Sequence, residues 1–70
     1  MEAVSAQPSH VALLRAAALV RPDLVGSLYA WDRDGGCRVG AFIDGADLVL
    51  AAEPSRLECL AALARLAADH

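Results

Sequence analysis

Asp32 and Asp34 have the spacing of the first two ligands in a calcium-binding loop. Such a loop needs a glycine at its sixth position and a bidentate glutamate at its twelfth. Those two positions hold Cys37 and Ile43, and neither side chain can take the required role. The segment Asp-Arg-Asp-Gly-Gly at 32–36 is instead typical of a turn between strands, because glycine accepts a positive φ and aspartate hydrogen-bonds the local backbone.

A zinc site would need clustered histidine and cysteine side chains, and the candidate ligands are His10, His70, Cys37 and Cys59. No C-x-x-C or H-x-x-x-H pair brings two of them together, so we expect solvated histidines and no bound metal. The segment Met1–Gln7 lacks the basic start and apolar core of a secretory signal. Both cysteines are therefore expected to be reduced thiols.

Groups suited to nucleophilic or acid-base catalysis are equally sparse. The serines are Ser5, Ser9, Ser27 and Ser55, and none lies in a nucleophile elbow. Asp44 and Asp47 flank a turn and not a pocket, which gives no basis for a catalytic carboxylate pair. The glycines form no phosphate-binding loop that leads into a helix. The sequence predicts a protein that is not an enzyme and that carries no cofactor.

The net charge has the wrong sign for binding a phosphate backbone. Nine carboxylates outnumber six basic residues, all of them arginine, for a formal net charge of −3. General binding to nucleic acid or to an anionic membrane depends on a basic patch, so we expect neither. No apolar run approaches the roughly 18 residues of a membrane span. We expect a protein partner with basic side chains and a location in the cytoplasm.

Two helices are predicted at the ends of the chain. Ser9 can cap a first helix over about 9–20, which Pro22 closes. Ser55 starts an S-x-x-E capping box at the head of a second helix over about 55–68. The expected sheet-facing residues are Val11, Leu14 and Ala18, broadened by Leu13, Ala17 and Val20, in the first helix, and Leu57, Leu60, Ala61 and Ala64, extended by Leu63, Leu66 and Ala67, in the second.

Between the helices the hydrophobic period changes to two, which indicates strands. Turn residues at 32–36 and 44–47 divide this stretch into strands at about 25–32, 38–44 and 48–52. Short connections make consecutive strands antiparallel. The predicted fold class is α+β in the order α-β-β-β-α, with a three-stranded antiparallel sheet and two helices on one face. A single small domain is expected over 1–70.

The remaining candidate residues would form a partner-binding surface. They are the carboxylates at or near strand ends, Asp32, Asp34, Asp44, Asp47 and Glu53, and two aromatic residues that share a strand face, Tyr29 and Trp31. The meander could bring some of the carboxylates together as a negative edge that enters a basic groove in place of phosphates. Tyrosine and tryptophan are common interface hot spots, although burial of Trp31 in the core is an equal alternative.

The predicted order of elements resembles that of the double-stranded RNA-binding domain over most of the chain. That family grips RNA through a lysine-rich start to its last helix, where this sequence has Pro54-Ser55-Arg56-Leu57-Glu58. Arg56 is the only basic residue there and Glu58 opposes it, so the resemblance implies the topology and not the RNA binding. Antitoxins of the HicB type are also similar in using a small sheet with helices, but no DNA-binding segment is recognised here.

In build, the chain also resembles the small anti-CRISPR proteins of phages and other mobile elements. The shared features are small size, acidity, an αβ fold and the absence of catalytic residues. The resemblance implies an inhibitor that binds a Cas subunit of a Cascade-type surveillance complex and blocks target DNA by phosphate mimicry. The alternative is an antitoxin or regulatory subunit that neutralises a small toxin or a transcription factor. Either protein is expected to be a monomer or a weak homodimer.

Overall fold

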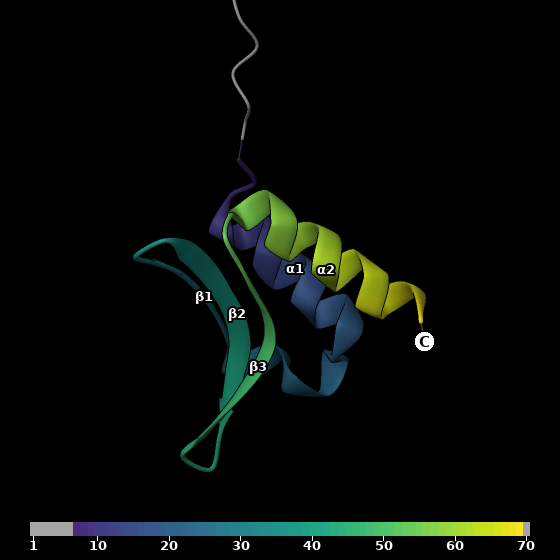
Figure 1. Ribbon diagram of the computed structural model, residues 1–70. Coiled ribbons are helices and arrows are strands. Elements are labelled where there is room, and N and C mark those ends of the chain that lie inside the picture. Colours follow the sequence, from purple (N-terminus) through teal and green to yellow (C-terminus); the bar gives the residue numbers. More distant parts are fainter. Residues whose placement is uncertain (1–6, 70) are drawn as a thin grey trace, which may run out of the picture.

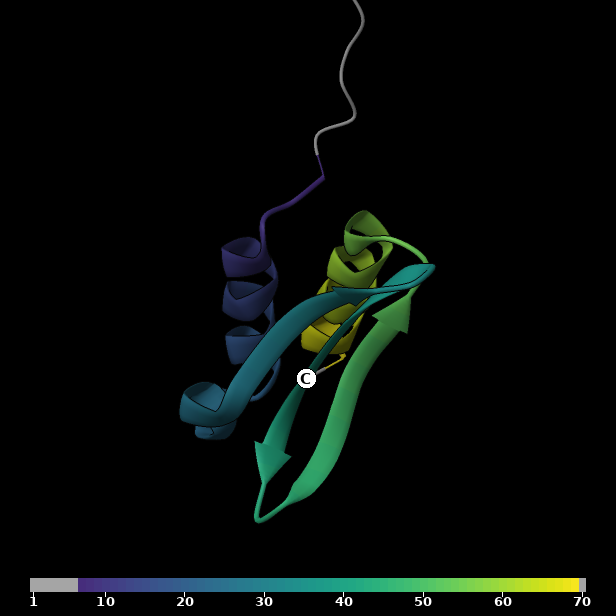
Figure 2. The ribbon, with the colours of Figure 1, turned by 90° about the vertical axis from the view of Figure 1, so that its left-hand side faces the viewer.

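The computed structural model describes residues 7–69 of the 70-residue chain. In chain order the elements are helix α1 (His10–Val20), the 3-10 helix η1 (Pro22–Ser27), strands β1 (Leu28–Arg33), β2 (Gly36–Ile43) and β3 (Ala46–Glu53), and helix α2 (Arg56–Ala68). The strands form one antiparallel sheet in the order β1-β2-β3. Both helices lie side by side on one face of this sheet (Figure 1, Figure 2). The predicted α-β-β-β-α fold class is confirmed.

Some predictions cannot be followed into the structure. The absence of a secretory signal rests on the first residues of the chain, and the solvated state of His70 concerns the last one. Residues 1–6 and 70 lie outside the described part. Within 7–69, neither helix has the length and apolar character needed to cross a membrane.

Serine side chains start both helices, as predicted. The Ser9 hydroxyl accepts a hydrogen bond from the Ala12 N–H at 3.1 Å. The Ser55 hydroxyl accepts one from the Glu58 N–H at 3.1 Å and donates to the Glu58 carboxylate at 3.0 Å. Each cap satisfies a backbone donor that has no partner within the helix.

The first strand begins later than predicted, because residues 22–27 form η1 instead of extended chain. Proline suits the first turn of a helix, since its fixed φ is already helical and its missing N–H is not needed there. The turn is also held locally, because the Leu24 N–H donates to the Arg21 carbonyl at 3.0 Å and the Arg21 guanidinium pairs with Asp23 at 2.8 Å. Alternating residues at 25–28 had suggested a strand, and this local turn overrides that pattern.

Two-residue turns connect the strands, so β2 and β3 are longer than predicted. Arg33 pairs with Gly36 across the first turn, and Ile43 pairs with Ala46 across the second. Gly35 has a φ of 77°, while Asp44 and Gly45 have φ values of 51° and 81°. The second turn therefore has the two consecutive left-handed residues that favour a tight hairpin, whereas in the first turn only Gly35 has a positive φ.

The core lies between the helices and the sheet. Its buried residues are Leu13, Ala17 and Val20 from α1, Cys59 and Leu63 from α2, and Cys37, Val39, Ala41 and Ala51 from the sheet. The predicted centre of each helical stripe was wrong, because Val11 in α1 and Leu57, Ala61 and Ala64 in α2 are exposed. Alanine and leucine occupy positions around most of the circumference of both helices, so the spacing of apolar residues alone could not identify the inward face.

Truncation of a core leucine tests this placement. Leu63→Ala should lower the free energy of unfolding by about 2–5 kcal/mol, because Leu63 is fully buried and the cavity cannot be refilled. The matched change Leu19→Ala removes the same atoms from an exposed site of α1 and should stay within about 0.5 kcal/mol. Urea unfolding followed by circular dichroism measures both, and equal losses would contradict the described core.

Candidate functional site

The sheet face opposite the helices carries an exposed apolar surface, which we call the aromatic face. It consists of Tyr29 and Trp31 from β1, Phe42 from β2 and Val49 from β3. Strand register places Tyr29 beside Gly40 and Gly40 beside Val49. The Tyr29 ring centroid lies 5.1 Å from that of Trp31 and 4.9 Å from that of Phe42, and the Trp31 and Phe42 rings meet edge to face at 6.5 Å. These distances are typical of favourable aromatic pairs.

Gly40 makes this arrangement possible because it leaves the middle of the face without a side chain. The Tyr29 ring lies across β2 and its hydroxyl donates to the Asp47 carboxylate on β3 at 2.6 Å. A Cβ atom at position 40 would lie 3.0 Å from the Tyr29 hydroxyl and would collide with the Leu48 carbonyl oxygen. The glycine therefore allows one side chain to span all three strands.

The aromatic face is exposed although its residues are large and apolar. Trp31, Phe42 and Val49 are 40%, 49% and 43% exposed. The uncovered face of an antiparallel sheet is commonly polar, whereas this one carries every aromatic residue of the chain. On other soluble proteins, large contiguous apolar patches often mark sites of contact with another molecule.

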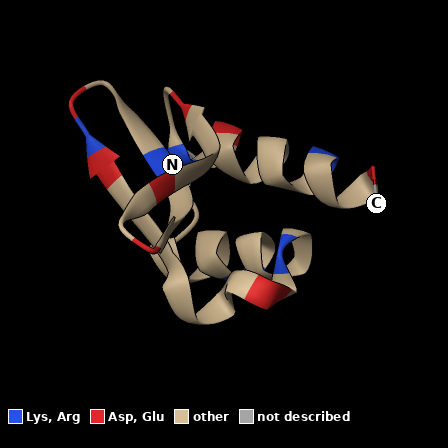
Figure 3. Cartoon of the chain, turned by 90° about the horizontal axis from the view of Figure 1, so that it is seen from below, with Lys and Arg blue, Asp and Glu red and all other residues tan. Residues whose placement is uncertain are grey.

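Charged side chains border the aromatic face. The Arg33 guanidinium carbon lies 5.9 Å from the centre of the Trp31 ring, within reach of a cation-π interaction. The Arg38 guanidinium lies 3.7 Å from the Asp47 carboxylate. Acidic and basic residues are interspersed over the strands and helices (Figure 3). The face is therefore an apolar centre with a mixed polar rim, the usual anatomy of a protein interface.

The five candidate carboxylates do not gather at one edge. Asp32, Asp34 and Glu53 lie at the end of the sheet that holds the β1–β2 turn, where Asp32 and Glu53 flank Cys37 in the pairing register. Asp44 and Asp47 lie at or beside the β2–β3 turn, which an antiparallel meander puts at the opposite end. The acidic edge thus divides into two groups separated by the length of β2.

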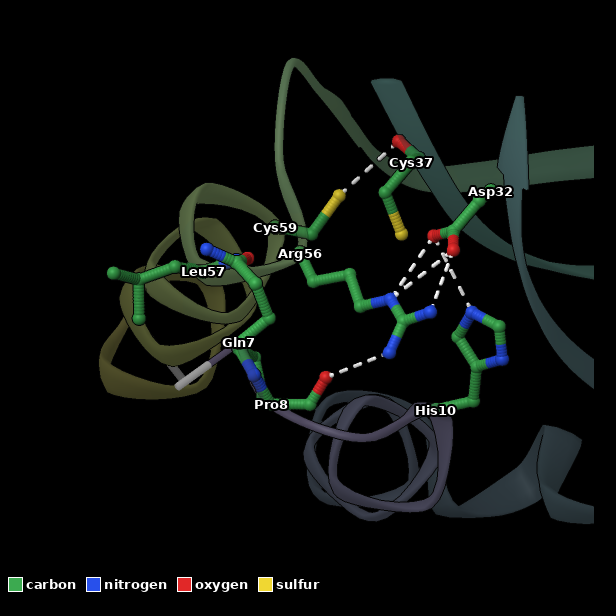
Figure 4. A network of polar contacts seen from close by, with 8 residues as sticks. All are labelled: Gln7, Pro8, His10, Asp32, Cys37, Arg56, Leu57 and Cys59. Atoms are coloured by element: carbon green, nitrogen blue, oxygen red, sulfur yellow. Dashed lines mark hydrogen bonds and ion pairs between the residues drawn. The ribbon is translucent and has the colours of Figure 1, made fainter. Parts of the chain in front are cut away.

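Asp32 takes part in a network that ties β1 to the starts of both helices (Figure 4). The Arg56 guanidinium holds both of its carboxylate oxygens, with the shortest contact at 2.6 Å. The His10 ring nitrogen lies 3.3 Å from the same carboxylate. The sequence predicts a solvated His10, and the structure adds this contact with Asp32. Arg56 also donates to the Pro8 carbonyl at 3.2 Å. The hydrogen bonds from Arg56 are the main cause of the lowered pKa of Asp32.

The two cysteines are free and buried, and they connect the sheet to α2. The Cys59 thiol donates to the Cys37 carbonyl at 3.2 Å. Burial, reinforced by the neighbouring Cys59 and Asp32, raises the pKa of the Cys37 thiol to about 12. A thiol with so high a pKa stays protonated and is a poor nucleophile or metal ligand.

Within residues 7–69 no group of three or more His, Cys, Asp or Glu residues could hold a metal ion. Comparison of the chain with models of protein families, with curated proteins and with solved structures finds no match. The description of the site therefore rests on the geometry of this chain.

Sequence reasoning named Tyr29 and Trp31 but missed Phe42, Val49 and the role of Gly40. The available signal was the turn, because a two-residue hairpin at Asp34-Gly35 puts Gly40 opposite Tyr29 and Phe42 on the same face. Val49 could be placed in the same way, because a two-residue hairpin at Asp44-Gly45 pairs it with Gly40. The register shift lies beyond that pair, where Leu50 is an extra residue, and it changes only which side chains of residues 51–53 face outward.

The Asp32–Arg56 contact predicts a pH-dependent stabilisation. The folded-state pKa of Asp32 lies below the unfolded value of about 3.9, so the contribution is full above that pH and disappears as the pH falls through the folded pKa. Asp32→Asn should therefore destabilise the protein at neutral pH, with a difference from wild type that shrinks in acid. Urea unfolding from neutral to acid pH measures it. The control is Asp34→Asn in the exposed turn, and a difference that is independent of pH would contradict the assignment.

Tyr29 is the single tyrosine and can be titrated without interference. Desolvation and, next, the hydrogen bond to Asp47 raise the pKa of Tyr29 to about 12, against about 10 in an unfolded chain. The resulting stabilisation is full below the unfolded pKa and is lost as the pH rises through the folded one. Tyrosinate absorbance should show this raised midpoint while circular dichroism remains native. Asp47→Asn should lower the titration midpoint of Tyr29, and Asp44→Asn should not. A midpoint near that of an unfolded chain in the native wild type would contradict the burial of Tyr29 and its hydrogen bond to Asp47.

Proposed function

We propose that this chain is a non-enzymatic protein-binding module and that the aromatic face is its contact surface. The observation that carries the proposal is that every aromatic residue of the chain lies on the one sheet face that the helices leave uncovered, where Trp31 and Phe42 are exposed and Tyr29 is half-buried. Tyrosine and tryptophan contribute large contact areas with few rotatable bonds, and for this reason they dominate the energetics of many interfaces.

The aromatic face is already organised for binding. The stacked rings and the Tyr29–Asp47 hydrogen bond restrict the side chains in the free protein. A partner that covers this surface therefore removes apolar area from water, which gains roughly 25 cal/mol per Å² before the costs of association. Those costs are reduced because little side-chain freedom is left to lose.

The charge of the chain narrows the class of partner. A net charge of −3 and carboxylates at both ends of the sheet favour a protein that presents an apolar patch flanked by lysine or arginine. A Cas subunit of a surveillance complex has this chemistry wherever it lines a DNA path, and the anti-CRISPR type of inhibitor is our more specific proposal. In this form the aromatic face supplies affinity, and Asp34, Asp44 and Glu53 meet basic side chains that otherwise engage DNA.

Phosphate mimicry alone is the weaker form of this proposal. Asp32 and Asp47 each contact an arginine of the same chain, which reduces the charge that they offer a partner. An antitoxin or regulatory subunit is the second candidate, and it uses the same aromatic face against a small toxin or a transcription factor. The salt dependence of binding distinguishes phosphate mimicry from contact through the aromatic face. Screening by salt weakens binding through charged groups and has little effect on binding through apolar groups.

A paired substitution tests the proposal. The tagged protein is used to capture partners from a bacterial host that carries a CRISPR system, and the affinity for the purified partner is then measured. The double variant Trp31→Ser with Phe42→Ser should weaken binding by about 100-fold or more, as expected when two hot-spot residues are lost. The matched control, Leu19→Ser with Val25→Ser, removes exposed apolar side chains on the helical side and should bind normally.

The identity of the captured partner distinguishes the two candidate functions. A Cas subunit in the captured complex supports the inhibitor proposal, and a toxin or a transcription factor supports the antitoxin alternative. Equal affinities of the wild type and the folded Trp31→Ser, Phe42→Ser variant would reject the aromatic face as the contact surface. Loss of binding in Asp34→Arg with Asp44→Arg, together with strong salt dependence, would instead assign the contact to the carboxylates.

A further inference from the structure

Strand β3 is an edge of the sheet, and its middle carries no charge. The strand order β1-β2-β3 leaves one side of β3 without a neighbouring strand. The stretch 48–52 is Leu-Val-Leu-Ala-Ala, without proline or a charged residue, whereas β1 at the other edge ends in Asp32 and Arg33. Proteins usually protect edge strands with charged residues, proline or a β-bulge, and in this stretch β3 has only the bulge at Leu50.

A groove runs beside this edge, between β3 and α2. Its β3 wall is formed by residues 49–53, and its α2 wall is formed by Ala62, Arg65, Leu66 and Asp69. The spacing of these four residues puts them on one face of α2. Leu66 is exposed within this stripe although it is apolar. We call this surface the β3 groove. It has an apolar centre, with one cation and one anion on its α2 wall and the carboxylate of Glu53 at the end of its β3 wall.

We propose that the β3 groove binds a second copy of this chain across a twofold axis. The axis sets the two β3 edges side by side and the two α2 stripes antiparallel. Each Arg65 is then directed toward Asp69 of the second copy, and each Asp69 toward the second Arg65. The surface is self-complementary in charge as well as apolar, which is what a twofold contact between identical chains requires.

The small core of the monomer favours this occupant. Five of its nine buried apolar residues are alanine or cysteine, and residues of this size bury little area. Domains near this length commonly gain stability from association. The extra residue Leu50 interrupts regular pairing along β3, so the groove side chains carry the contact and a continuous backbone ladder does not. Tyr29, Trp31 and Phe42 remain free in such a dimer, because Val49 is the one residue that the aromatic face shares with the groove.

A charge swap tests the contact directly. Sedimentation equilibrium of the full chain from micromolar to millimolar concentration should show a reversible dimer. Arg65→Asp brings four carboxylates together at the axis and should raise the dimer dissociation constant by about tenfold or more. The double variant Arg65→Asp with Asp69→Arg restores the opposite charges and should recover the wild-type constant. The control Arg15→Asp makes the same change in net charge on α1 and should have little effect.

A second pair of variants tests the apolar part of the groove. Leu66→Lys should abolish the dimer, while Leu57→Lys, at an exposed position on the first turn of the same helix, should not. Circular dichroism verifies the fold of each variant. A monomer over the whole concentration range would overturn the proposal. A dimer that tolerates Arg65→Asp but dissociates in Trp31→Ser with Phe42→Ser would overturn it as well, because the two chains would then meet through the aromatic face.

Discussion

The close packing of two helices on only one face of the sheet is the constraint on which the rest of the structure depends. Small residues such as Ala17, Cys37 and Ala51 fill much of the interface, and Leu13 and Leu63 provide its larger side chains. No large ring lies in this layer. The aromatic residues are therefore confined to the opposite face, where nothing in the described chain covers them. A thin core and an exposed aromatic face are two consequences of the same arrangement.

Turn chemistry decides which residues reach that surface. The two-residue turns at Asp34-Gly35 and Asp44-Gly45 set the register of the sheet, and a slip of one residue would move every side chain of a strand to the other face. Gly40 then provides the space into which the Tyr29 ring extends. The local conformation of a few small residues thus builds the aromatic face, although none of them contributes apolar area to it.

Much of the fold could be predicted from the sequence because its signals are local. Ser9 and Ser55 mark the helix starts, glycines mark the turns, and strand alternation put Tyr29 and Trp31 on one face. The inward faces of the helices could not be predicted, since alanine and leucine surround most of each helix. The turn of η1 was missed because Pro22 and the Arg21–Asp23 pair act against an alternating pattern.

The candidate site was only partly predictable, because it depends on contacts between distant segments. The sequence identified Asp32 as a surface carboxylate, but Arg56, 24 residues away, holds it in an ion pair. Antiparallel pairing separates the remaining carboxylates between the two ends of the sheet. Phe42 and Val49 join the aromatic face only through strand register, which the two turns set. The extra residue Leu50 shifts the pairing of residues 51–53 in a way that no local pattern reveals.

Trp31 is the single tryptophan of the chain and lies in the aromatic face, so its fluorescence reports whether a partner covers that face. Quenching of Trp31 by acrylamide is measured in the free chain and in its complex with a partner that lacks tryptophan or has had its tryptophans replaced. Contact through the aromatic face should leave Trp31 accessible in the free chain and should give strong protection with a blue-shifted emission in the complex. Equal quenching in both states would show that the partner binds elsewhere and would exclude the aromatic face as the contact surface.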